Sequence, residues 1–156
     1  MHDFIIKSLD YRDFSRLFLL NDVDLEKEGA VRMKANSYPG FPCRVSLEDA
    51  HPGEEVILIS YPHHLTDSPY RSSGPIFVRK NAKQITWNRN EIPSMLLHRL
   101  LSLRAYDRTG MMKQAIVMDG RDICTGLHLL FDDMEIAYIH IHNAKPGCYN
   151  CMAIRV

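Results

Sequence analysis

The stretch from Tyr138 to Cys151 constrains the fold of this chain more than any other part of the sequence. It begins with alternating β-branched and polar residues, reaches an Asn-Ala-Lys-Pro-Gly break at 143–147, and continues into a second run at Cys148–Val156. Two such runs around a turn-forming break are typical of a β-hairpin. Side chains alternate between the two faces of a strand, so His140 and His142 should share one face with Tyr138, opposite the neighbouring isoleucines. The sequence therefore predicts an antiparallel hairpin with an imidazole-bearing face.

Hydrophobic periodicity predicts the other elements of secondary structure. We expect strands at Phe4–Leu9, Val31–Ala35, Glu54–Tyr61, Ile76–Arg79, Leu101–Tyr106 and Met112–Met118, a short extended piece at Cys43–Leu47, and helices at Tyr11–Leu20, Pro93–Leu100 and Asp122–Phe131. Glu54–Tyr61 is apolar on both faces and should be a central strand. The turn-rich stretch Pro62–Pro75 is predicted to be a long loop, which in a compact domain is usually functional or mobile. Hairpins dominate, so we expect an α+β fold with a mostly antiparallel sheet and about three helices.

Composition limits the partners and the location of the protein. The chain has 19 Lys plus Arg and 19 Asp plus Glu, so it lacks the basic excess typical of nucleic-acid binding. No apolar run approaches the roughly 18 residues of a membrane span, and the amino terminus does not resemble a signal peptide. We therefore expect a cytoplasmic protein with no nucleic-acid or membrane partner, whose four cysteines are free thiols. No Gly- or Ser-rich linker divides the chain, so residues 1–156 should form one domain.

Metal binding is the first chemistry that the hairpin suggests. Two histidines at alternate strand positions place their rings on one side, and neutral imidazole is a common ligand for zinc and similar divalent ions. His140 and His142 are therefore candidate metal ligands, with His63 and His64 as further candidates. The alternative is that the same residues form a hydrogen-bonded polar or aromatic face without a metal.

A third ligand from the hairpin depends on its register. A two- or four-residue loop would place Cys151 opposite His142 and Ala153 opposite His140. A three-residue loop would pair His142 with Asn150 and remove the thiol from the set. In an extended strand Cys148 and Cys151 point to opposite faces, so the pair is a weak indication of a zinc ribbon.

Thiol chemistry and anion recognition are two further possibilities. Cys148 follows a Pro-Gly turn, where free backbone amides and a nearby His or Arg would favour a nucleophilic thiolate. Arg44, Arg71, Arg104 and Arg155 lie in or beside predicted extended segments, and Ser72-Ser73-Gly74 could supply backbone donors to a carboxylate or phosphate. These features favour a small anionic molecule as a partner.

Several sequence blocks carry a resemblance to a known family. They are Cys43-Arg44 with Leu47, Ser68-Pro69-Tyr70-Arg71, Gly74-Pro75-Ile76-Phe77-Val78, Arg104-Ala105-Tyr106-Asp107, and the stretch from His140 to Cys148 with Arg155. From about residue 40 to the carboxyl terminus, the chain resembles an uncharacterised bacterial family, domain of unknown function 1203. The resemblance implies a bacterial, soluble, single-domain protein in which Cys148, but not Cys151, belongs to the shared motif. It implies no activity and no catalytic residue.

These observations lead to two functional hypotheses. The first is a small-molecule pocket walled by the histidine face, the Pro62–Pro75 stretch and Arg104, used by an enzyme that depends on Cys148 or on a metal held by His140 and His142. The second is a non-catalytic ligand-binding or assembly module, which could also form a homo-oligomer. The candidate ligand-binding residues are Arg44, Tyr70, Arg71, Arg104 and Asn143.

Overall fold

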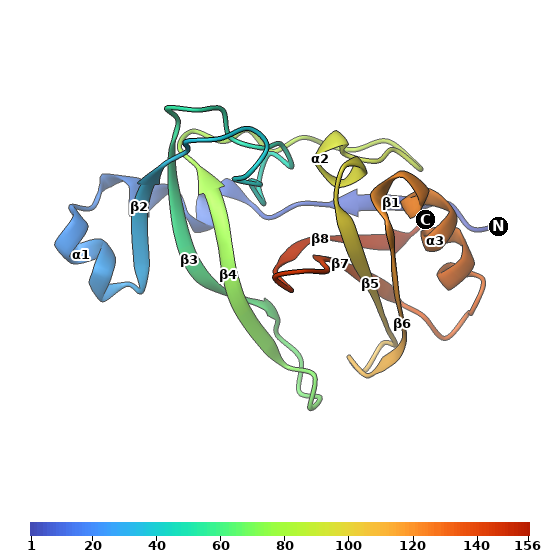
Figure 1. Cartoon of the computed structure of the whole chain (residues 1–156). Coiled ribbons are helices and arrows are strands. Elements are labelled where there is room, and N and C mark those ends of the chain that lie inside the picture. Colours follow the sequence, from blue (N-terminus) through green and yellow to red (C-terminus); the bar gives the residue numbers. More distant parts are fainter.

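The computed structural model describes residues 1–156 and contains two antiparallel sheets (Figure 1). The five-stranded sheet has the order β1-β8-β7-β5-β6 and consists of β1 (Phe4–Lys7), β5 (Leu100–Tyr106), β6 (Met112–Asp119), β7 (Tyr138–Asn143) and β8 (Tyr149–Arg155). The three-stranded sheet has the order β2-β3-β4 and consists of β2 (Ala30–Lys34), β3 (Glu55–His64) and β4 (Ser72–Arg79). The predicted α+β class is confirmed, and β3 is the central strand of its sheet as expected.

Three α-helices accompany the sheets: α1 (Asp22–Lys27), α2 (Ser94–Leu97) and α3 (Ile123–Phe131). Short 3-10 helices lie at Tyr11–Asp13, Ser15–Leu19 and Gly120–Asp122. In Figure 1, α3 lies beside β5 and β6, at the end of the molecule away from β2–β4. None of these helices combines the length and the apolar character that a membrane crossing requires.

Each sheet has a core of its own. The larger core joins α3 to the five-stranded sheet, and Leu127 and Phe131 pack there with the inward-facing Leu103, Ile139 and Ile141. The smaller core packs the segment of 3-10 helices and α1 against the three-stranded sheet. The apolar face of β7 therefore packs against α3, and the opposite face, with the histidines, points away from that core.

The segment Tyr11–Leu20 differs from the expected helix. Asp10 caps it as predicted by accepting a hydrogen bond from the Arg12 amide, but the chain forms two 3-10 helices separated at Phe14. Phe14, Leu17 and Phe18 are buried against the three-stranded sheet. The apolar pattern correctly identified the buried residues, whereas tertiary packing determined the type of helix.

Half of the predicted long loop Pro62–Pro75 is instead strand. β3 continues through His64 and β4 begins at Ser72, which leaves only residues 65–71 as the turn. A register shift between Tyr61 and His64 accommodates Pro62, and Pro75 lies on the edge strand β4, where a missing amide donor is tolerated. Cys43–Leu47 likewise forms no strand: an isolated bridge from Cys43 to Phe77 leads into a turn.

The register of the β7–β8 hairpin matches neither predicted alternative. Ile141 lies opposite Cys151 and His142 opposite Tyr149, with a register shift between the two pairs. The shift arises because β8 contains one extra residue, Asn150, in a β-bulge. Cys151 consequently faces the apolar side and is fully buried in the larger core, so it is excluded from the histidine face.

Candidate functional site

Three histidines from the two sheets meet between them. In the β5–β7 pairing, Arg104 lies opposite His140 and Ser102 opposite His142, so these four side chains share one face of the larger sheet. His63 reaches the same place from β3 of the smaller sheet. Each of the three histidines offers one ring nitrogen, and these nitrogens lie within 4.8 Å of one another.

Each of these histidines has a buried ring nitrogen that forms no hydrogen bond within the protein. His142 Nδ1 lies 2.9 Å from the Gly147 carbonyl oxygen, which only an N–H can approach as a hydrogen-bond donor. This bond fixes the tautomer and leaves the lone pair on Nε2. His142 Nε2, His140 Nδ1 and His63 Nδ1 are buried and have no hydrogen-bond partner. Buried polar atoms rarely lack a partner, so this group of three free nitrogens indicates a binding site.

His64 provides an internal contrast. Its Nδ1 lies 2.8 Å from the Tyr70 carbonyl oxygen and its Nε2 lies 2.7 Å from the Tyr138 hydroxyl. Both ring nitrogens are therefore engaged, and His64 joins the hydrogen-bonded aromatic layer instead of the ligand group. Of the two further candidate ligands on this stretch, the structure brings His63 to the site and assigns His64 to structural bonding.

Aromatic packing holds the His63 ring in place. The ring stacks on Tyr149 with 5.2 Å between centroids and an interplanar angle of 6°. It also meets His142 edge-on at 5.1 Å. A stacked and an edge-on neighbour together restrict the rotation of the imidazole, so the ligand group is partly preorganised.

Burial keeps all three histidines neutral. Desolvation is the main cause that lowers the pKa of His140 to about 2, of His142 to about 3 and of His63 to about 4. The positive charge of Arg104 contributes to the lowering in each case. Neutral imidazole is the form that binds metal, so near neutral pH no proton competes with a cation for these nitrogens.

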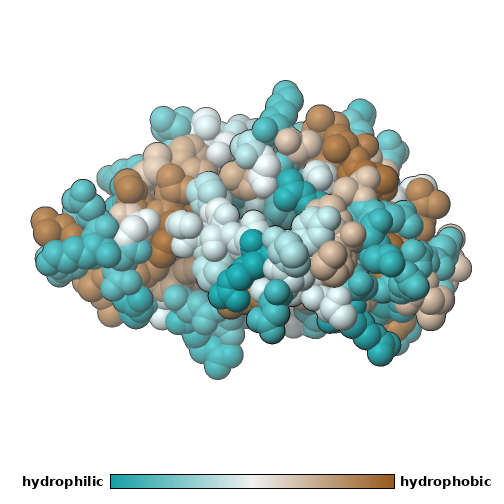
Figure 2. Space-filling model, turned by 90° about the horizontal axis from the view of Figure 1, so that it is seen from below, coloured by the Kyte–Doolittle hydropathy of each residue, from teal (hydrophilic) through white to brown (hydrophobic).

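A small cavity of about 210 Å³ opens beside His63. Its lining combines β3–β4, β5 and the β7–β8 turn: His63, Ser72, Ser73, Gly74, Pro75, Arg104, Pro146, Gly147, Cys148 and Tyr149. No carboxylate belongs to this lining, and Arg104 is its only formally charged side chain. Viewed from below, the middle of the molecule is hydrophilic to neutral in hydropathy, with more hydrophobic areas toward both ends (Figure 2).

Arg44 lies behind the cavity and supports the β7–β8 turn. Its Nε donates to the Tyr149 carbonyl at 2.7 Å and its Nη1 to the Pro42 carbonyl at 2.5 Å. The side chain is 2% exposed and forms no ion pair with a carboxylate. Burial lowers the pKa of Arg44 to about 10, while the nearby Cys148 thiol acts in the opposite direction.

The remaining sequence candidates lie outside the cavity. Asn143 accepts a hydrogen bond from the Asn150 side chain at 2.7 Å and lines a different hollow beside Lys145. Tyr70 and Arg71 belong to the β3–β4 turn, where both side chains are exposed. The structure therefore brings His63, His140, His142, Arg104 and Cys148 together, places Arg44 behind them, and separates the other three from them.

The turn of β3–β4 contacts the β5–β6 turn. Ser68 Oγ donates to the Gly110 carbonyl at 2.6 Å, and Thr66 Oγ1 donates to the Thr109 carbonyl at 3.2 Å. The two turns approach each other at the bottom of Figure 1. These contacts fix the hairpin that carries His63 relative to the sheet that carries His140 and His142.

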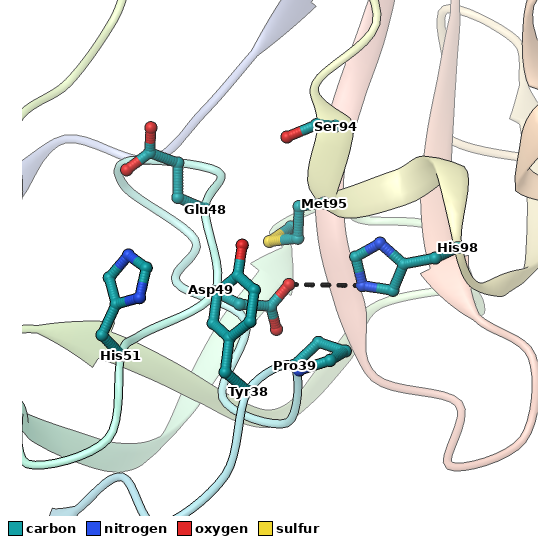
Figure 3. A pocket seen from close by; sticks show the side chains of 8 residues that line it. All are labelled: Tyr38, Pro39, Glu48, Asp49, His51, Ser94, Met95 and His98. Carbon is teal, nitrogen blue, oxygen red and sulfur yellow. Dashed lines mark ion pairs between the residues drawn. The ribbon is translucent and has the colours of Figure 1, made fainter.

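The largest pocket of the molecule lies elsewhere (Figure 3). It has a volume of about 520 Å³ and is lined by Tyr38, Pro39, Glu48, Asp49, His51, Ser94, Met95 and His98. Its buried carboxylate, Asp49, is already paired with Arg99 at 2.5 Å and lies 3.4 Å from His98. No polar atom of this lining is buried without a partner, so the histidine group is the stronger candidate site.

The comparison with family models identifies the family of the chain. The model described as a protein of unknown function, DUF1203, matches residues 40–155. The chain belongs to the DUF1203 family. The DUF1203 region contains His63, His140, His142, Arg104 and Cys148, while β1, α1 and β2 precede it. Neither the curated proteins nor the solved structures include one that matches the chain. The expected family is thus confirmed, and the function is inferred from the geometry of the site.

Sequence reasoning did not identify Tyr149 as part of the site. The residue is 4% exposed, stacks on His63 and lies opposite His142. An aromatic residue directly after Cys148 was the available signal, but the face of β8 to which it belongs depends on the bulge at Asn150. The alternation rule fails across a bulge, because the extra residue reverses the faces beyond it.

Proposed function

We propose that this protein binds a divalent transition metal, in the first place zinc, through His63, His140 and His142, and uses it in an enzyme reaction on a small molecule. The observation that carries the proposal is the group of three neutral imidazoles whose ligand nitrogens lie within 4.8 Å of one another. Zinc, copper, iron and nickel accept imidazole, whereas magnesium and calcium prefer oxygen ligands.

The number of these residues and the hydrogen bond that orients one of them suit such a metal. Three protein ligands leave one position of a tetrahedral zinc open, which is the pattern of catalytic rather than structural sites. The hydrogen bond from His142 Nδ1 to the Gly147 carbonyl is the outer contact that orients a ligating imidazole. The nitrogens of a tetrahedral zinc are about 3.3 Å apart, so the rings must draw together on binding.

Residues around a bound metal would have distinct roles. A bound divalent metal would supply Lewis-acid activation of water or of a substrate oxygen. Arg104 would hold a negatively charged substrate group in the cavity, and Tyr149 would keep His63 oriented. The contact between the two turns would hold the strand that carries His63 next to the sheet that carries His140 and His142.

Elemental analysis of untagged protein tests the proposal directly. Purified protein that has been stripped and reloaded with zinc should retain about one equivalent after desalting. The His140→Ala, His142→Ala double variant should retain none, whereas the control double variant His2→Ala, His51→Ala, which changes histidines outside the site, should behave as the wild type. Folding of each variant is checked by circular dichroism. Folded wild-type protein that retains no metal, or a site variant that retains as much as the wild type, would falsify the proposal.

Thiol chemistry at Cys148 is the second candidate function. Its support is the position of Cys148 in the same cavity, near the buried guanidinium of Arg44. Rapid alkylation of Cys148, compared with the half-buried control Cys124, together with loss of ligand binding on modification, would favour this route. Stoichiometric binding of a ligand by protein that contains no metal, with slow alkylation of Cys148, would instead favour a non-catalytic binding module.

A further inference from the structure

We infer that the histidine site takes a small oxyanion, a carboxylate or a phosphate-type group, which binds together with the metal and is held by Arg104. This inference rests on the proposed metal site and names the class of molecule that completes it. Its starting point is the composition of the cavity lining: Arg104 is the single formally charged side chain, and no carboxylate faces it.

Arg104 lacks the partner that most partly buried arginines in this protein have. Its only hydrogen bond is from Nε to Ser102 Oγ at 3.4 Å, which is long. By contrast, Arg79 pairs with Glu54 at 2.7 Å and Arg99 pairs with Asp49 at 2.5 Å. A half-buried guanidinium without a carboxylate has unused N–H donors in the planar geometry that suits carboxylates and phosphates.

A second uncompensated charge lies close by. Arg44 is 2% exposed, donates only to backbone carbonyls and has no carboxylate partner. Adding a divalent cation near these two arginines, both of which act electrostatically on His142, would concentrate positive charge in a partly desolvated region, which is unfavourable without a counter-ion. An anion bound at the open metal position would offset the charges of the metal and of Arg104 together.

The cavity also limits the size of the anion and supplies other donors. At about 210 Å³ it is smaller than the range of roughly 300–1,000 Å³ that accommodates drug-sized ligands. Ser72 and Ser73 line it, and neither hydroxyl is used in a hydrogen bond within the protein. The site therefore fits a small molecule with one oxyanionic group, with hydroxyl donors available beside the guanidinium.

The affinities for the metal and for the anion should be coupled. Because the anion neutralises repulsion that opposes the cation, each should tighten binding of the other by the same factor. It also predicts an opposite effect without an anion: replacing Arg104 by a neutral residue should then tighten metal binding, because one repelling charge is removed. A residue with a purely structural role in β5 would show neither behaviour.

Cobalt(II) titration of the metal-free, full-length protein tests the inference. Binding is followed by the visible absorption of cobalt, in a zwitterionic buffer without halide, with acetate, with methylphosphonate, or with neither. Wild-type protein should bind cobalt about 5-fold or more tightly when either anion is present, within the usual range of coupling between sites. Acetate and methylphosphonate separate a carboxylate from a phosphate-type ligand, and an effect of either one supports the inference.

Three variants complete the design. Arg104→Gln should bind cobalt more tightly than the wild type without anion and should lose the anion effect, while Arg104→Lys should retain part of it. Arg108→Gln, which removes an exposed arginine from the neighbouring turn, is the matched control and should behave as the wild type. Cobalt binding that no anion alters, or an anion effect that persists in Arg104→Gln, would overturn the inference and leave the metal site standing. Absence of cobalt binding under every condition would overturn both.

Discussion

The three neutral histidines make the stability of the metal-free protein depend on pH in a defined direction. Their pKa values are lowered in the folded state to about 2, 3 and 4, whereas an unfolded histidine titrates near 6.5. Below pH 6.5 the unfolded chain therefore binds protons that the folded chain does not. Stability is fully present above pH 6.5 and decreases as the pH falls toward the folded-state values.

The magnitude follows from the unfolded-state titration. At pH 5.5, each histidine that stays neutral in the folded state lowers the free energy of unfolding by about 1.4 kcal/mol relative to high pH. His140 and His142 are 3% and 0% exposed and should each contribute about this amount. His63 is only half-buried and should contribute about half as much, because solvent screens it. The expected decrease between pH 7.5 and 5.5 is therefore about 3.5 kcal/mol, a large part of the roughly 5–15 kcal/mol that stabilises an ordinary domain.

Urea unfolding at pH 7.5 and pH 5.5, with a chelator present, measures this change. The range avoids most carboxylate titration, which occurs at lower pH. His140→Gln should reduce the pH-dependent loss by about 1 kcal/mol, whatever its effect on stability at pH 7.5. His51→Gln, which changes an exposed histidine, is the control. A wild-type loss below about 1 kcal/mol, or the same loss in His140→Gln, would refute the reasoning from burial.

Three further predictions concern the stability of the fold. Gly120→Ala should destabilise the protein by about 3 kcal/mol or more in urea unfolding, because a Cβ there would overlap the Leu96 carbonyl oxygen and lie 2.9 Å from that of Arg99; wild-type stability would contradict this packing. Arg99→Met should cost about 3 kcal/mol by leaving the buried Asp49 carboxylate unpaired, and adding Asp49→Asn should recover part of the loss; a double variant less stable than the single one would argue against the ion pair. Leu127→Ala, at a fully buried position on α3, should cost about 2–5 kcal/mol, and a cost below 1 kcal/mol would show that α3 contributes little to the larger core.

Local periodicity predicted the faces of the larger sheet well. The alternation in β7 placed His140 and His142 on one face and Ile139 and Ile141 on the other, and the structure has this arrangement. The same rule placed Arg104 on the face opposite Leu103 in β5. Such predictions succeed because the side-chain period of a regular strand is fixed by backbone geometry and does not depend on distant contacts.

Features that depend on bulges or on long-range packing were not predictable in this way. His63 was a candidate on a supposed loop, because Pro62 and the turn formers around it do not indicate a strand. Only pairing with β4 and the register shift between Tyr61 and His64 make this segment part of β3. Similarly, the bulge at Asn150 directed Cys151 into the core and Tyr149 into the site. One extra residue reverses every face beyond it, and no local pattern marks its position.

The position of the site follows from which face of the larger sheet packs against α3 and which is directed toward the smaller sheet. The larger sheet covers its apolar face with α3 and presents a face of histidines and Arg104 toward the smaller sheet, whose β3 contributes His63. An apolar inter-sheet contact here would have stabilised the fold more simply than three imidazoles that each leave one buried nitrogen without a partner, since each unsatisfied polar group costs stability. The same polar contact would become favourable if the proposed cation and anion bound between the sheets, because they would satisfy the free nitrogens and Arg104. The cost to the unliganded fold is thus the strongest reason to assign this interface to ligand binding.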